Sequence, residues 1–150
     1  MKYRAGKYTR WRCPYRKNEM NTLIAPKLRQ AHHNGKTAYH AGLAAEKSVA
    51  RNYGRQGYAL IAQRWRGTGG EIDLIVQQGD CFVFVEVKKS KSFSQAALRI
   101  TPRQKNRIFA AASEFVSDQP QGLLSEMRFD VGLVDSAGRI EIIENALWDG

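Results

Sequence analysis

The sequence predicts a single α/β domain with the element order α-β-β-β-α-β-β. Apolar residues recur at helical spacing in two separate stretches, and short apolar runs bounded by turn residues fill the chain between and after them. The 150 residues are enough for one domain with a sizeable core, and a hydrophobic content of 43% is ordinary for a globular protein.

Spacing and turn residues locate each element. The first helix is predicted over 38–53, where apolar residues recur with a helical period, and Gly54 ends it. Thr101-Pro102 opens the second helix, because proline is favoured at an early helical position. The predicted strands are short runs of apolar residues. They cover 58–62, 71–77, 81–88, 129–134 and 140–143.

Positive charge is concentrated at the N-terminus. Residues 1–36 hold ten Lys or Arg and one acid, a charge of +9, which leaves +1 of the total +10 for residues 37–150. We therefore predict a basic, flexible arm in front of one folded domain. Such an arm favours nucleic acid, with Arg10 and Arg12 meeting phosphates and Trp11 stacking on bases. A solvated tail without a partner is the alternative.

Acidic residues interrupt two neighbouring apolar strands. Asp73 lies within the first, and Glu86 and Lys88 lie at the end of the second, where side-chain alternation puts both on one face. Charges in apolar strands are costly to bury unless they are paired, and a short turn between the strands can bring all three together. Two carboxylates and a lysine at one end of a sheet predict a divalent-metal site for cutting phosphodiesters.

A third carboxylate comes from the first helix. Glu46 lies at the edge of its apolar face, so it can point toward the sheet. If Glu46 joins Asp73 and Glu86, the three carboxylates repel one another, and a divalent cation removes that repulsion. A set of oxygen ligands suits Mg²⁺ or Mn²⁺ and argues against zinc.

The order of motifs along the chain resembles a known family. The motifs include Glu71-Ile72-Asp73 and Val85-Glu86-Val87-Lys88, and they lie at 42–46, 56–58, 65–66, 70–75, 83–88, 101–102, 128–131 and 145–148. They resemble the YraN family of uncharacterised bacterial proteins, which is grouped with the PD-(D/E)xK nucleases near the Holliday-junction-resolvase-like branch. The resemblance implies a restriction-endonuclease-like fold, with an αβββαβ core and a mixed central sheet flanked by helices.

The resemblance also implies roles for individual residues. Asp73 and Glu86 would ligate the metal, the Val87 carbonyl would be a third oxygen, and Glu46 would ligate directly or through water. Lys88 would position or deprotonate the attacking water. The implied activity is metal-dependent endonucleolytic hydrolysis of nucleic acid, with DNA favoured, branched DNA included and RNA open. The alternative is a non-catalytic nucleic-acid-binding protein that keeps the nuclease fold.

Some positions depart from the family pattern. Arg64 stands where Asn is common, and Lys89-Ser90 stand where Thr and Arg are usual, so a phosphate-contacting Arg is missing there unless Lys91 replaces it. On the second helix, either Gln104 or Lys105 is expected near the site. The nucleic-acid contacts expected in the folded domain are Arg66, Lys89, Lys91, Gln104 and Lys105.

Two further acids are interpreted mainly as structural. Glu71 is expected to cap a strand end or to pair with Arg66, and Asp130 to pair with Arg128 or Arg107.

Composition also bears on compartment and assembly. No apolar run approaches the roughly 18 residues that span a membrane, and no apolar segment follows the basic N-terminus as in a secretory signal. We expect a cytoplasmic protein without a membrane partner. Cys81 is predicted to be a buried free thiol that forms no bridge to Cys13. Junction-resolving relatives act as symmetric dimers, so a homodimer is one expectation.

Overall fold

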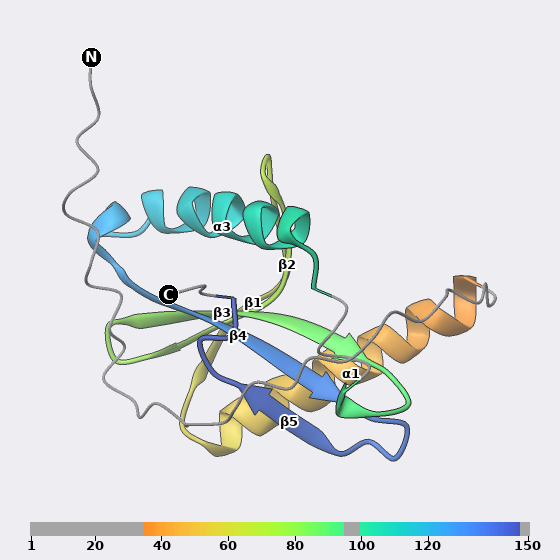
Figure 1. The fold of residues 1–150 in the computed structure, drawn as a ribbon. Helices are drawn as coiled ribbons and strands as arrows, with labels where there is room; N and C mark the ends of the chain where they lie inside the picture. Colours follow the sequence, from red (N-terminus) through yellow and green to blue (C-terminus); the bar gives the residue numbers. More distant parts are fainter. Residues whose placement is uncertain (1–34, 95–99, 148–150) are drawn as a thin grey trace.

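The computed structural model describes residues 35–94 and 100–147, in which helices lie on both sides of one sheet (Figure 1). The sheet has five strands in the order β1-β2-β3-β4-β5. The elements are α1 (Gly35–Arg55), β1 (Ala59–Gly67), β2 (Gly70–Gln78), β3 (Cys81–Lys89), α3 (Pro102–Ser117), the short 3₁₀ helix η1 (Gly122–Leu124), β4 (Glu126–Val134) and β5 (Ile140–Ile143).

The sheet is mixed, as predicted. Strands β1, β2 and β3 form an antiparallel meander, β3 pairs parallel with β4, and β5 returns antiparallel to β4. A parallel neighbour requires a crossover connection, and α3 lies within the connection from β3 to β4. This arrangement confirms the predicted α/β class and is consistent with a restriction-endonuclease-like core.

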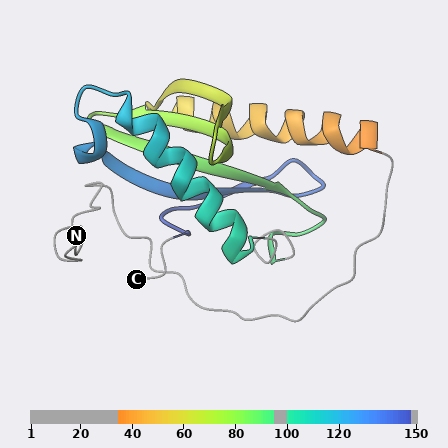
Figure 2. The same ribbon diagram turned by 90° about the horizontal axis from the view of Figure 1, so that it is seen from above.

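Each face of the sheet has its own apolar core. Ala45, Val49 and Tyr53 of α1 pack with one set of strand residues, whereas α3 packs with another. Figure 1 shows α3 above the sheet and α1 below it, and Figure 2 shows from above how α3 runs obliquely over the strands. On the α3 side, the ring of Phe115 meets Trp65, Phe82 and Phe84 edge-on, with centroids 5.5–5.8 Å apart.

Helix α3 begins where the sequence predicts it. The Thr101 hydroxyl accepts from the Gln104 N–H over 3.2 Å, and Gln104 Oε1 accepts from the Thr101 N–H over 3.0 Å, which completes a capping box with Pro102 in the first turn.

Strands β1 and β4 extend furthest beyond their predicted bounds, while β2 and β3 differ from theirs by no more than one residue at either end. Strand β1 continues to Gly67, past the predicted end at 62. The prediction stopped early because the following residues are mostly polar, which an edge strand tolerates. Strand β4 begins at Glu126 rather than at the predicted 129. The prediction started late because Arg128 interrupts the apolar pattern, and this arginine can be buried in the strand because it is ion-paired.

The expectation of a free thiol at Cys81 was wrong. The residue is buried, as predicted, but it is disulfide-bonded. Burial in an apolar strand indicates where a cysteine lies and carries no information about its oxidation state. Cys13 lies outside the described residues, as does nearly all of the predicted arm. Within the described ranges, no helix is long and apolar enough to cross a membrane.

Candidate active site

Strand β2 leaves strand β3 at Asp73. Backbone pairing between the two strands extends as far as Leu74 and Val85. Past that pair, the Val87 N–H donates to Asp73 Oδ2 over 2.8 Å, so a side-chain carboxylate takes the place of a backbone acceptor. The packing of β2 breaks at the same point, because Leu74 joins the α1 core while Ile72 joins the α3 core, although strict alternation would put them together. Asp73 therefore occupies a split in the sheet.

Glu86 and Lys88 lie beside this split on β3. Lys88 Nζ contacts Glu86 Oε1 at 2.5 Å, and the two side chains are only 17% and 13% exposed. The contact agrees with the strand alternation that puts both on one face. Because the pair is largely withdrawn from water, solvent screens it less than it would an exposed pair.

The surroundings of Asp73 disfavour the charged form of its carboxyl group. Its burial, together with the nearby Glu86 and Glu46 carboxylates, raises the pKa of Asp73 to about 7 despite the opposing Val87 hydrogen bond and the Lys88 charge. The split thus brings carboxylates together at a point where little water is available to stabilise their negative charge.

Glu46 reaches this group from α1. The carboxyl is half-buried, and its pKa is raised by burial and by the charges of Glu71 and Glu86, against the lowering effect of Arg64. The structure therefore places Glu46, Asp73 and Glu86 within electrostatic range of one another.

The donors at the split fit a hard divalent cation only in part. Among residues 35–94 and 100–147, no group of three or more His, Cys, Asp or Glu side chains is arranged to hold a metal ion. Glu46 therefore does not complete a three-carboxylate set in this arrangement. Asp73 and Glu86 remain as oxygen donors, with the carbonyl of Val87 on the same strand. Mg²⁺ and Mn²⁺ prefer such oxygen ligands and accept water molecules for the rest.

The part of the chain that carries these residues matches a known family. The model of the uncharacterised protein family UPF0102 matches residues 45–134, a range that includes Glu46, Asp73, Glu86 and Lys88. The chain belongs to this family. UPF0102 is the YraN family, so the resemblance found in the sequence is confirmed.

Relatives in UPF0102 cover most of this chain. A UPF0102 protein of Roseobacter denitrificans is 63% identical over 79% of this chain and 92% of its own length. A UPF0102 protein of Cereibacter sphaeroides is 55% identical over 75% of this chain and 97% of its own. A third, from Ruegeria pomeroyi, is 56% identical over 73% and 89%. Their names record the family and state no activity.

The residues predicted to contact nucleic acid lie on several elements of the structure. Lys89 and Lys91 are exposed where β3 ends and just after it, while Gln104 and Lys105 lie in the first turn of α3. The side-chain oxygen of Gln104 serves the capping box. Arg10, Trp11 and Arg12 lie outside the described residues.

The predicted pair between Glu71 and Arg66 is present, and sequence reasoning missed a second partner. Glu71 Oε2 accepts from Arg66 Nε over 2.5 Å, and Glu71 Oε1 accepts from Arg64 Nε over 3.0 Å. The sequence marked Arg64 only as a departure from the family pattern. The alternation of Arg64, Arg66 and Glu71 on paired strands was the available signal.

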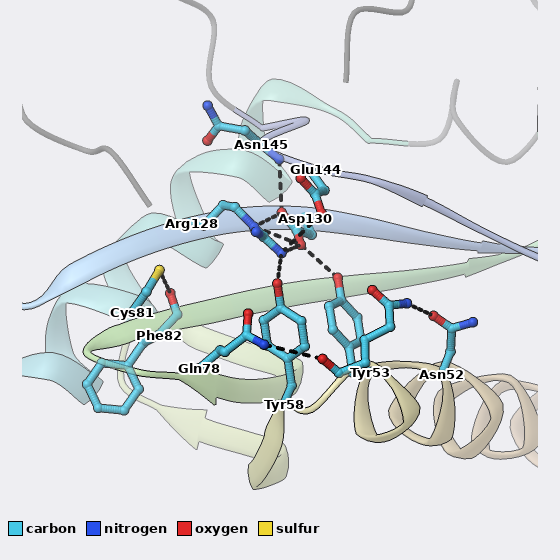
Figure 3. A network of polar contacts seen from close by, with 11 residues as sticks. Asn52, Tyr53, Tyr58, Gln78, Cys81, Phe82, Arg128, Asp130, Glu144 and Asn145 are labelled. Carbon is cyan, nitrogen blue, oxygen red and sulfur yellow. Dashed lines mark hydrogen bonds and ion pairs between the residues drawn. The ribbon is translucent and has the colours of Figure 1, made fainter. Parts of the chain in front are cut away.

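The predicted pair between Asp130 and Arg128 is also present, and it is buried (Figure 3). Arg128 donates to both oxygens of Asp130, over 2.9 and 2.7 Å. The Tyr53 hydroxyl donates to Oδ2 over 2.7 Å, and the Asn145 N–H donates to Oδ1 over 2.9 Å. With both oxygens occupied by partners on β4, on α1 and in the turn after β5, Asp130 serves the structure, as the sequence suggested.

Proposed function

We propose that this UPF0102 protein is a metal-dependent endonuclease that hydrolyses phosphodiester bonds of nucleic acid, with DNA the favoured substrate. The observation that supports it is the split between β2 and β3, where the partly buried Asp73 lies with the Glu86–Lys88 pair. A partly buried cluster of carboxylates with a neighbouring cation is typical of sites at which charge develops during a reaction.

Each residue at the split has a task in this proposal. Asp73 and Glu86, with the Val87 carbonyl, would hold Mg²⁺ or Mn²⁺, which when bound supplies Lewis-acid polarisation of the phosphate and lowers the pKa of water. Lys88, held by Glu86, orients the attacking water and offsets the charge that develops on the phosphate oxygens. Glu46 orients water at the edge of the site through its half-buried carboxyl.

Two measurements test this proposal. Calorimetric titration with Mn²⁺ should show binding to the wild type and its loss in Asp73→Asn, while Asp80→Asn, an exposed change in the same hairpin, should bind as the wild type does. Lys88→Met should keep metal binding and lower cleavage by roughly 10²–10⁴-fold. Lys47→Met, on the exposed side of α1, is its matched control. Cleavage that survives both Asp73→Asn and Lys88→Met in clean preparations would contradict the proposal.

A second candidate is a nucleic-acid-binding protein without catalysis. It is favoured by the lack of a group of three metal-ligating side chains among the described residues, and by the use of Glu86 in an ion pair. It predicts salt-sensitive binding of DNA with no uptake of Mn²⁺, either alone or with DNA present. Tight Mn²⁺ binding that requires Asp73 and Glu86 would exclude it.

A further inference from the structure

Glu71 holds two arginines at the edge of the sheet. Arg66 Nε donates to Glu71 Oε2 over 2.5 Å and Arg64 Nε donates to Glu71 Oε1 over 3.0 Å, so each guanidinium is held by one oxygen of the same carboxylate. Two guanidiniums on one carboxylate leave a net positive charge. Arg64 is 30% exposed and Arg66 is 73% exposed, so both retain donors that face solvent.

The backbone of Arg64 is in an unusual conformation. Its φ is +49°, in the left-handed region that side chains other than Gly, Asn and Asp rarely adopt. The residue lies within strand β1, so no turn requires this conformation. Such strain persists only where the surroundings enforce it, most often at functional sites.

The strained residue also contacts an exposed aromatic ring. The Arg64 guanidinium carbon lies 5.2 Å from the ring centroid of Tyr39, a cation–π distance, and Tyr39 is 54% exposed near the start of α1. Tyr39 thus presents an exposed ring next to the Arg64 cation.

These residues adjoin the candidate active site on an open edge. Arg66 lies directly opposite Glu71 in the β1–β2 pairing, and Glu71 precedes Asp73 on the same strand. Arg64 and Glu71 both act electrostatically on Glu46, which joins the group to the carboxylates at the split. Strand β1 is at the end of the sheet order, so its outer side has no neighbouring strand in the described sheet.

We propose that Arg64, Arg66 and Tyr39 form a binding site for a nucleic-acid strand beside the carboxylates. The two guanidiniums, held in place by Glu71, bind phosphodiester phosphates, and the Tyr39 ring stacks on a base. The placement of this site rests on the proposed function, which locates the chemistry at Asp73. The binding itself needs neither metal nor cleavage.

The conformation of Arg64 allows a sharp test in the full-length protein. Arg64→Asn removes the guanidinium, while Asn accepts the left-handed backbone better than Arg. We therefore expect its melting temperature to equal or exceed that of the wild type. Arg66→Gln removes the second cation. Arg55→Gln, on the last turn of α1, removes an exposed arginine away from this group and is the matched control.

Binding is measured by fluorescence anisotropy with a labelled DNA oligonucleotide, in chelator and over a series of salt concentrations. Arg64→Asn and Arg66→Gln should each weaken binding several-fold and reduce the slope of log K against log salt by about 0.7–0.9. Arg55→Gln should change neither quantity. Tyr39→Ala should weaken binding without changing the slope.

A double variant, Arg64→Asn with Arg66→Gln, that folds normally and keeps both the wild-type affinity and slope would overturn this site. The arginines would then only brace the β1–β2 hairpin. Because these measurements exclude metal, their failure is separate from a failure of the proposed activity. A changed slope together with absent cleavage would uphold the binding site and remove the endonuclease.

Discussion

At the scale of single residues, Asp73 makes the stability of the fold depend on pH. Its pKa is about 7 in the folded chain and near the ordinary value of 3.8 when unfolded. A raised pKa means that the folded state favours the protonated acid. The associated stability is fully present below pH 3.8 and is lost as the pH rises through about 7.

This dependence can be isolated with Asp73→Asn in metal-free buffer. Asn can still accept the Val87 hydrogen bond but carries no charge. The variant should match the wild type near pH 4 and exceed its unfolding free energy at pH 8 by roughly 2–4 kcal/mol, measured by urea denaturation. The exposed Asp80→Asn is the control. A constant difference between pH 4 and 8 would show that the Asp73 carboxyl is not destabilised by its surroundings.

At the scale of elements, the approach of α1 to the sheet depends on Gly132. A methyl group at this position of β4 would lie 2.9 Å from Cγ1 of Val49, closer than real contacts allow. Gly132→Ala should therefore push α1 away from the sheet and destabilise the protein by about 1–3 kcal/mol.

A double-mutant cycle checks this contact. Val49→Ala alone leaves a cavity and destabilises the protein, but in the Gly132→Ala background it makes room for the new methyl group. The combined loss in unfolding free energy should be smaller than the sum of the single losses. Additive losses would mean that the glycine is needed for another reason.

The types of the elements could be predicted from sequence, because each helix and strand buries apolar residues with its own period. Strand alternation predicted one part of the site, namely that Glu86 and Lys88 lie on the same face of their strand. The break in β2 at Asp73 and the positive φ of Arg64 have no counterpart in a periodic pattern. The Val87 hydrogen bond depends on the point at which β2 and β3 separate, so it could not be anticipated, whereas side-chain alternation offered a signal for the second partner of Glu71.

At the scale of the whole molecule, the buried network around Asp130 joins parts of the chain that are distant in sequence. Arg128 and Asp130 are on β4, Tyr53 is near the end of α1, and Asn145 follows β5. Nη1 of Arg128 is buried without a hydrogen-bond partner among the described residues. Asp130, at 2.7 Å, is the nearer of the two carboxylates that compensate this buried guanidinium, and Glu144 is the other, at 3.7 Å.

Asp130→Asn should consequently destabilise the protein by about 3–5 kcal/mol, because it removes the nearer counter-ion of the buried Arg128 charge and leaves only Glu144, at 3.7 Å. Tyr53→Phe removes one hydrogen bond to the same carboxylate and should cost less, about 1–2 kcal/mol. Urea denaturation of both variants measures the two losses. Equal losses would show that hydrogen bonding to Tyr53, rather than charge compensation, dominates the network. If Asp130→Asn unfolds the chain, Arg128→Met with Asp130→Asn should restore much of the stability, since a buried pair can be replaced by uncharged side chains of similar size.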